Sequence, residues 1–549
     1  TVSEIFYAGL FNLMCEATAF YATPSYQKSM FNYFREEPGF YSEELLSPAN
    51  ENIENVVLRD TNLVSIKNSP EFHTNKNSNT PTNRLCTSLF QKDRLSFLLQ
   101  YAFAYVKTKD GLQKHIMRYP QIFATKAIEK KLDEGIKKGI IWHTQGSGKT
   151  ALAYYNVKFL TDYFNKSGVV PKFYFIVDRI DLLTQASREF KSRGLVVHNI
   201  SSKEDFAKDI KSVSAIHSNS GKPEITVVNI QKFQDDANVV KSTDYQINIQ
   251  RVFFLDEVHR SYNPRGSFLA NLELTDTNAI KIGLTGTPLI LNKEQYQKSI
   301  EGDTKKFASK SIFGDYIHKY YYNLSIKDGY TLRLIREEID TSYKLTMQKA
   351  LDEIKILKGE AERTFLYSHR KFVEPMLQYI VEDFQKARIA MNDKTIGGMV
   401  ICDSSDQAKM LYEVFQEQYE VPEQAEQLMA AETAIFTTSG DRYKVKSAAL
   451  ILHDIGDKQF KKDQIEDFKE GKIDLLFVFN MLLTGFDAPR LKKLYIGRVI
   501  KAHNLLQALT RVNRTYKDYR YGYVVDFADI QKQFDIANRD YFNELQDEL

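Results

Sequence analysis

HTQGSGKT, residues 143–150, stands between a short apolar run, GIIW at 139–142, and the stretch KTALAYYNVKFL at 149–160. Its two glycines allow the main chain to approach phosphate oxygens, and the N–H groups of a following helix attract an anion. Lys149 can then reach the β- and γ-phosphates of a nucleotide, and the Thr150 hydroxyl can bind Mg²⁺. The order strand, loop, helix therefore predicts an ATP-binding loop, with contacts from Thr144, Gly146, Ser147, Gly148, Lys149 and Thr150.

Short apolar runs recur on both sides of this loop, with amphipathic stretches between them. Near-continuous apolar strands that alternate with helices indicate a parallel sheet covered on both faces. The runs form two series, which predicts an α/β protein with two such sheets in tandem. The first series is 139–142, 172–177, 224–229, 251–256 and 280–285, and the second is 397–402, 433–438, 473–479, 493–497 and 522–527.

Two adjacent carboxylates, Asp256 and Glu257, close the apolar run RVFFLD at 251–256. The carboxyl ends of parallel strands are where α/β proteins bind ligands. We expect Asp256 to hold Mg²⁺, and Glu257 to orient and deprotonate the attacking water.

Two further turns follow predicted strands. GLTGTP at 283–288 offers threonine hydroxyls in a tight turn, close to the predicted acidic site. LTGFDAP at 483–489 follows a strand of the second series, where Gly485 and Asp487 could contact the nucleotide or the backbone of a nucleic acid. Both turns are expected to couple nucleotide chemistry to the rest of the protein.

QALTRVNR at 507–514 is predicted to be helical, with Gln507, Arg511 and Arg514 on one face because they are four and three residues apart. Opposite a bound γ-phosphate, the two arginines would stabilise the charge of the transition state. A second α/β layer has a purpose in a motor, whose ATP site is shared by two domains that open and close.

Size and charge limit the other possibilities. The 549 residues are too many for one domain, and 74 Lys and Arg against 71 Asp and Glu give a net charge of only +3. A nucleic-acid site must therefore be a local lining. The chain shows no apolar run of membrane-spanning length and no secretory leader. Its three distant cysteines predict neither disulfides nor a zinc site, so a cytoplasmic protein is expected.

The whole set of motifs resembles superfamily-2 helicases and, in detail, the motor (R) subunit of type I restriction enzymes. The resemblance is strong over about 115–530 and weak over 1–110. The segments that carry it are IIWHTQGSGKT (140–150), FIVDRIDLLTQ (175–185), FLDEVHRS (254–261), GLTGTP (283–288), LLTGFDAP (482–489) and QALTRVNRTY (507–516). RYPQIFATKAI (118–128) resembles the family's upstream element, TVVNIQKF (226–233) one of its track-facing motifs, and FGDYIHKYYYNLSIKDGY (313–330) the exit of its first domain.

The resemblance implies two tandem RecA-like domains that use ATP and Mg²⁺ to move along double-stranded DNA. It also implies modification (M) and specificity (S) subunits as partners, and no membrane. Gln121 would recognise adenine, and four residues would face DNA: Arg179, Thr184, Gln185 and Gln231.

The domain order of the R-subunit family that the chain resembles predicts how this chain is organised. Because no Glu, Gln or Asp stands two residues before a Lys in 1–110, the family's DNA-cleavage site is expected to be absent. The expected parts are the end of a nuclease-like domain (1–45), a linker and helical lead-in (46–114), RecA-like domain 1 (115–329), a connector (330–395), RecA-like domain 2 (396–530) and the start of a C-terminal helical region (531–549).

Two alternatives remain at this point. One is a strand-separating DNA or RNA helicase, or the related type III restriction motor, which sequence separates poorly from the first reading. The other is a nucleotide-binding scaffold that does not hydrolyse ATP. Lys149, Asp256, Glu257, Arg511 and Arg514 together argue against the scaffold, because a scaffold needs no catalytic groups.

Overall fold

The computed structural model divides into two compact units, Thr1–Tyr321 and Tyr322–Leu549, which are described separately. No helix among the described residues is both long and apolar enough to span a membrane. The structure describes residues 13–15, 18–21, 32–36, 50–70, 72–73, 88–109, 111–200, 202–211, 222–230, 249–258, 276–288, 309–358, 363–420, 443–482, 486–500 and 502–528.

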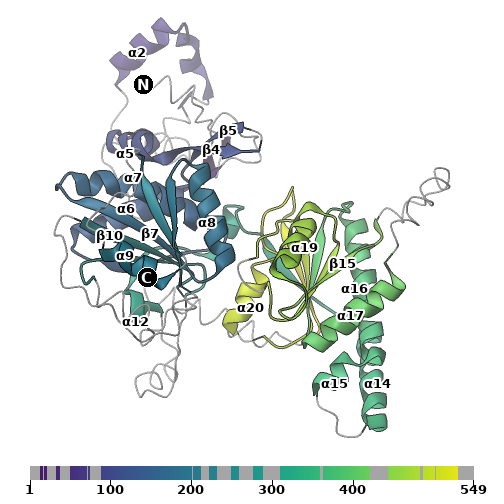
Figure 1. Ribbon diagram of the computed structural model, residues 1–549. Coiled ribbons are helices and arrows are strands. Elements are labelled where there is room, and N and C mark those ends of the chain that lie inside the picture. The colour runs from purple at the N-terminus through teal and green to yellow at the C-terminus, as the bar shows by residue number, and fades with distance from the viewer. Residues whose placement is uncertain are drawn as a thin grey trace. The chain divides into compact units, whose positions relative to one another are not determined.

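Unit 1 is built on a seven-stranded parallel sheet (Figure 1). The strands of this sheet, in spatial order, are β12 (Tyr316–Tyr320), β6 (Lys138–His143), β11 (Ile280–Thr285), β10 (Ile249–Asp256), β7 (Val170–Val177), β9 (Glu224–Asn229) and β8 (Val196–Ile200). The helices around it are α6 (Tyr119–Asp133), α7 (Lys149–Asn165), α8 (Ile180–Ser192), α9 (Lys203–Lys211) and α12 (Ser309–Phe313).

The inner strands of unit 1 are apolar because both faces of the sheet are covered. Trp142, Tyr174 and Phe253 are completely buried, and the rings of Tyr174 and Phe253 stack with centroids 4.6 Å apart. Burial of one such side chain contributes about 1.5–3 kcal/mol to folding. All five strands predicted in this region are therefore present.

Smaller elements precede this sheet. Antiparallel strands β1 (Leu13–Cys15), β2 (Thr18–Tyr21) and β3 (Asn32–Phe34) form one small sheet, and the hairpin β4 (Phe103–Thr108) and β5 (Gly111–Ile116) forms another. The helices here are α2 (Glu51–Asp60) and α5 (Lys92–Phe97). The lead-in over 46–114 is not helical beyond Ala102, because Phe103 begins a strand whose side chains alternate between solvent and core.

Unit 2 contains a six-stranded parallel sheet. Its strands, in order, are β13 (Arg333–Glu338), β18 (Tyr521–Asp526), β17 (Leu491–Ile496), β14 (Gly397–Ile401), β16 (Leu475–Val478) and β15 (Ala448–Ile451). Its helices are α13 (Tyr322–Lys327), α14 (Thr341–Lys358), α15 (Arg363–Ser368), α16 (Arg370–Ala390), α17 (Ser405–Gln418), α19 (Lys458–Glu470) and α20 (Ala502–Leu509). Two parallel α/β units, each with helices about its sheet, confirm the predicted fold class.

Segment 330–395, which we expected to be a connector, lies within unit 2. It supplies the edge strand β13 and the helices α14 to α16, and Val373, Ile380 and Phe384 of α16 are buried in the core. The predicted strand 433–438 lies outside the described residues.

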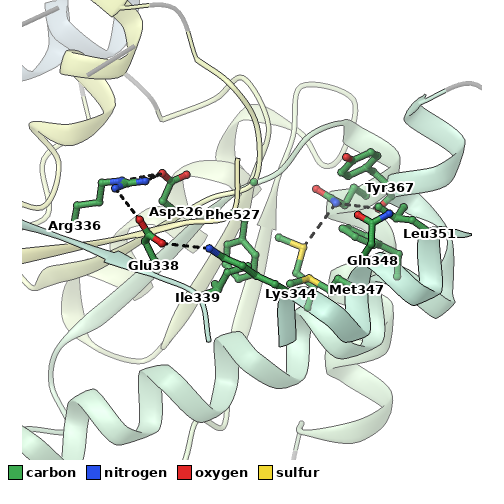
Figure 2. Close-up of a pocket in the computed structure, with 14 residues that line it drawn as sticks. Arg336, Glu338, Ile339, Lys344, Met347, Gln348, Leu351, Tyr367, Asp526 and Phe527 are labelled. Atoms are coloured by element: carbon green, nitrogen blue, oxygen red, sulfur yellow. Dashed lines mark hydrogen bonds and ion pairs between the residues drawn. The ribbon is translucent and has the colours of Figure 1, made fainter. Parts of the chain in front are cut away.

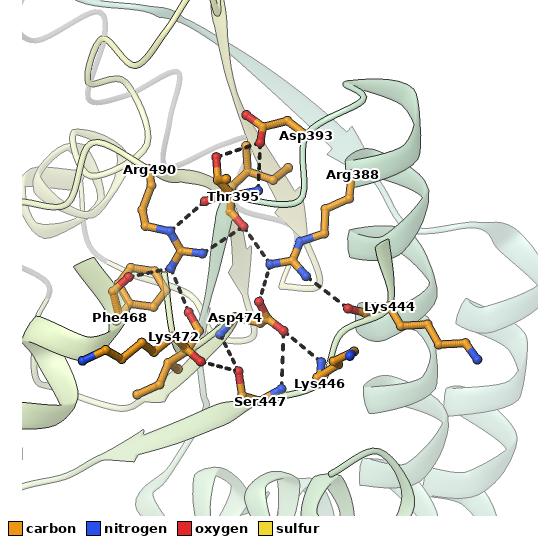
Figure 3. Close-up of polar contacts among 12 residues, drawn as sticks. Arg388, Asp393, Thr395, Lys444, Lys446, Ser447, Phe468, Lys472, Asp474 and Arg490 are labelled. Carbon is orange, nitrogen blue, oxygen red and sulfur yellow. Dashed lines mark hydrogen bonds and ion pairs between the residues drawn. The ribbon is translucent and has the colours of Figure 1, made fainter. Parts of the chain in front are cut away.

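A buried polar network closes the amino end of the second sheet (Figure 3). The carboxylate of Asp474, directly before β16, forms an ion pair with Arg388 of α16 and accepts from the main-chain N–H of Lys446 at 2.8 Å. Arg490, directly before β17, donates to the carbonyls of Phe468 and Ile473 at 2.6 and 2.7 Å. Burial lowers the pKa of Arg490 to about 10, yet these contacts keep its donors satisfied. The predicted residues Asp487 and Arg514 lie at the same amino edge, because Asp487 precedes β17 and Lys492, near the start of β17, donates to the carbonyl of Arg514.

Candidate functional site

The predicted nucleotide loop lies between β6 and α7, as expected. Gly146 and Gly148 have φ of 81° and 83°, a backbone region that side chains disfavour, so the turn requires glycine at both positions. Gly148 is the N-cap of α7, and Lys149 begins the helix. The Lys149 ammonium donates to the main-chain oxygens of His143 and Thr144 at 3.3 and 3.5 Å. These carbonyls hold the ammonium over the loop, where a bound phosphate would meet it.

Parallel pairing brings the acidic strand end to the same edge of the sheet. β10 pairs with β11 up to Asp256 and Leu284, and β11 pairs with β6 up to Thr285 and Trp142. Glu257 follows with φ 50°, which is unfavourable for a residue other than glycine. Such strained residues gather at functional sites.

Charge is unbalanced at this edge. Burial and the neighbouring Glu257 raise the pKa of Asp256 to about 7, and Asp178 acts in the same direction, whereas Lys149 opposes it. A divalent cation would relieve this repulsion, so the donors fit Mg²⁺. Among the described residues, no group of three or more His, Cys, Asp or Glu side chains could hold a metal ion. Mg²⁺ in nucleotide sites takes most of its ligands from phosphate and water, so a site there needs few protein ligands.

The turn after β11 packs directly on the nucleotide loop. The indole N–H of Trp142 donates to the carbonyl of Gly286 at 3.2 Å. A Cβ on Gly286 would lie 3.1 Å from the main-chain nitrogen of Gln145 and 3.3 Å from the oxygen of His143. The Thr285 hydroxyl accepts from the N–H of Thr287 at 3.1 Å, which fixes the turn. The first and third predicted motifs therefore contact each other.

Gln121 is buried beside the loop. Its amide donates to the carbonyl of Gly148 at 2.9 Å and accepts from the N–H of Arg118 at 2.9 Å. Recognition of adenine stays a prediction, and it would require one of these bonds to be exchanged. Sequence reasoning missed Arg118, whose guanidinium donates to the carbonyl of Gly146 at 2.9 Å. Its place three residues before Gln121 was the available signal.

The last strand of unit 1 also contacts the loop. The main-chain N–H of Thr144 donates to the carbonyl of Tyr320 at 3.0 Å. The buried His143 imidazole lies 2.7 Å, nitrogen to nitrogen, from His318 of β12. Histidine stands where the common loop pattern has glycine, and here it links β6 to β12. The sequence predicted neither contact, because strand order is not visible in it.

In unit 2, Asp487, Arg511 and Arg514 lie together. The Arg511 guanidinium donates to the carbonyl of Phe486 at 2.5 Å, and Arg514 forms an ion pair with Asp487 at 3.5 Å. The predicted single helical face is wrong, because α20 ends at Leu509. Arg511 follows in a turn, and Arg514 bridges to Thr331 in an isolated β-bridge. Gly485 lies outside the described residues.

The predicted DNA-facing residues of unit 1 cluster at one helix start. Arg179 is the N-cap of α8, and Thr184 and Gln185 are exposed on that helix. The role of all three residues stays a prediction. Gln231 lies outside the described residues.

Unit 2 also contains a cavity of about 560 Å³ at the carboxyl ends of β13 and β18 (Figure 2). Arg336 forms ion pairs with Asp526 and Glu338, and Lys344 pairs with Glu338 at 3.3 Å. Met347 and Leu351 make its other end apolar. Because two cations and two carboxylates cancel, the lining does not favour a polyphosphate. The loop after β6 remains the candidate nucleotide site.

Comparison with known proteins gives the family. Residues 120–364 match the family described as SWI2/SNF2 ATPase, and residues 423–529 match the one described as type I restriction enzyme subunit R domain 3. In these matches and in its curated relatives, the chain is similar to the R subunits of type I restriction enzymes. The resemblance predicted from the motifs is thereby confirmed, and the chain carries an ATPase domain.

Two curated relatives share about a quarter of their aligned residues with this chain. It is 27% identical over 454 residues to the type I restriction enzyme SauMRSORF196P endonuclease subunit of Staphylococcus aureus, which covers 77% of the chain and 45% of the relative. It is 26% identical over 488 residues to the putative MjaVIIIP endonuclease subunit of Methanocaldococcus jannaschii, covering 80% and 46%. The chain thus spans about half the length of these relatives.

One solved structure supports the fold. The ATP-dependent Type ISP restriction-modification enzyme LlaBIII bound to DNA matches with a TM-score of 0.50 at 12% identity. The match covers 76% of this chain and 28% of that one. At this identity the likeness concerns the fold alone.

Proposed function

We propose that this chain is the ATP-hydrolysing motor of a type I restriction complex and that it moves double-stranded DNA. The observation that supports this most is the meeting of the Lys149 loop, Asp256–Glu257 and the Thr285–Thr287 turn at one sheet edge. Bound Mg²⁺ would supply positive charge to the phosphates. Asp256 and Thr150 hold the cation, Lys149 binds the phosphates, and Glu257 orients water and accepts its proton.

Unit 2 is proposed to supply Arg511 and Arg514, which stabilise charge as the γ-phosphate leaves. Duplex DNA would contact Arg179, Thr184, Gln185 and Gln231 through its phosphates. M and S subunits would provide sequence recognition. DNA cleavage is not proposed for this chain, because residues 1–110 lack the expected Glu-, Gln- or Asp-x-Lys pattern.

Stimulation of ATP turnover tests the proposal. Hydrolysis should rise with duplex DNA and less with single strands or RNA, and Lys149→Ala should abolish it. Lys131→Ala is a matched control, because Lys131 forms a solvent-exposed ion pair with Glu134 at 2.8 Å, near the end of α6. Normal turnover in Lys149→Ala would refute the loop assignment, and stimulation by RNA alone would favour a helicase.

The affinity of the chain for duplex DNA should fall steeply as salt is added, because phosphate contacts release counterions.

A further inference from the structure

Lys492 and Lys493 are neighbours in β17 whose side chains have opposite surroundings. Lys493 forms ion pairs with Glu337 at 2.6 Å and Asp383 at 3.0 Å. Lys492 is completely buried and donates to a main-chain carbonyl, that of Arg514, at 2.6 Å. The ion pairs of Lys493 explain its place in the strand. Lys492 instead contacts the segment after α20 that contains Arg511 and Arg514.

Counted together with its charged neighbours, Lys492 belongs to a set with more basic groups than carboxylates. Arg514 and Tyr516 face it from the segment after α20, with the Tyr516 ring centroid 5.7 Å from the ammonium. Asp487 faces it from the turn before β17 and forms the ion pair with Arg514. The adjacent strand β14 presents glycines at this level. The set therefore holds two basic groups and one carboxylate, so an added anion would be stabilised here.

The pKa of Lys492 reflects its burial and the nearby positive charge. Burial, and then the positive charge of Arg514, lower its pKa to about 7, while Asp487 opposes the shift. Near neutral pH the amine thus exchanges between neutral and charged forms. A phosphate placed at the arginines would favour the charged form, because opposite charges attract strongly in a partly desolvated site.

We propose that Lys492 is a positioning residue that takes up a proton when a nucleotide phosphate binds at Arg511 and Arg514, and that its ammonium then holds the main chain of Arg514. The inference rests on the proposed function, since it requires those arginines to meet a nucleotide. The proton comes from solvent and converts the amine to an ammonium, with no other bond formed or broken. Nucleotide binding and the order of the arginine segment are thereby linked through one proton.

Calorimetric titration of the full chain with adenylyl imidodiphosphate and Mg²⁺ at pH 8 tests this link. Repeating the titration in buffers of different ionisation enthalpy gives the number of protons taken up per nucleotide. The wild type should take up a substantial fraction of one proton more than Lys492→Met. Lys461→Met is the matched control, because Lys461 also donates to a main-chain carbonyl, that of His453 at 2.6 Å, but is far more exposed. It should behave as the wild type does.

The two possible failures are distinguishable. Equal proton uptake in wild type and Lys492→Met, with binding and hydrolysis intact, would overturn the inference alone. A wild type that binds no nucleotide would overturn the proposed function and this inference with it. Should Lys492→Met fail to fold, Lys492→Arg carries the test. Arginine stays charged at pH 8, so that variant should bind and hydrolyse ATP with the extra proton uptake lost.

Discussion

Glu257 combines backbone strain with a proposed chemical role. Its φ of 50° places a side chain where glycine is favoured, directly after the buried strand β10. A non-glycine residue in this region costs about 1–2 kcal/mol. The surrounding strands hold the conformation, so the carboxylate is fixed at the sheet edge next to Asp256.

Glu257→Gly should stabilise the fold and stop the chemistry. Relief of the strained φ should raise the free energy of unfolding by about 1 kcal/mol relative to Glu257→Gln. Both variants should bind nucleotide and lose turnover, because neither has a base. Urea unfolding and an ATPase assay measure the two effects. A Glu257→Gly variant less stable than Glu257→Gln would show that the left-handed backbone is not strained.

At the scale of elements, the sequence predicted the inner strands and missed the edges. The unpredicted strands β8, β12, β13 and β15 are the four edge strands of the two parallel sheets. Inner strands are buried on both faces and read as apolar runs, whereas YIHKY in β12 and RLIREE in β13 carry polar residues toward solvent. Pattern alone does not separate such strands from loops.

The end of α20 illustrates the second limit. The spacing of residues in 507–514 fits a helix, but tertiary contacts end α20 at Leu509. The Thr510 hydroxyl donates to the carbonyl of Gln507 at 2.7 Å, and Arg511 reaches across to Phe486. The sequence thus identified the arginines but not the turn and bridge that hold them. Lys492 was equally hidden, although a lysine pair in an apolar strand was a visible anomaly.

Gly522 allows β18 to approach the turn that carries Arg511. A Cβ there would lie 2.1 Å from the oxygen of Val512, so the turn would have to move. Gly522→Ala should cost about 1–3 kcal/mol of stability and reduce hydrolysis at least tenfold. Nucleotide binding through Lys149 should be retained. Unchanged turnover at saturating ATP would mean that the position of this turn does not limit catalysis.

The contact between His143 of β6 and His318 of β12 should make the stability of unit 1 sensitive to acid. Burial lowers the pKa of His143 well below its ordinary value, and His318 and Lys149 act in the same direction. The unfolded chain binds the proton near pH 6.5 while the folded chain does not, so stability falls as pH drops below that value. His143 should account for about 1 kcal/mol of the loss between pH 7.5 and 5.5. Denaturant midpoints of wild type and His143→Asn measure it, and identical pH dependence would contradict the argument.

At the scale of the whole molecule, two sheets with separate cores should unfold in two steps. Scanning calorimetry should resolve two transitions, of which an ATP analogue with Mg²⁺ raises the one belonging to unit 1. At 100 times the Kd the gain is about 2.7 kcal/mol. Lys149→Ala should lose this shift, and Asp474→Asn should lower only the other transition, by breaking a buried ion pair. One transition that moves as a whole would refute independent cores.

The contact between the loop and β12 has a mechanical consequence. Thr144 is bonded to Tyr320, and Tyr321 alone separates β12 from α13, the first helix of unit 2. The Tyr321 ring is braced edge-on against Trp142, with centroids 5.1 Å apart. A displacement of the nucleotide loop at Thr144 would therefore be felt at Tyr320, the last residue of β12, through a single hydrogen bond.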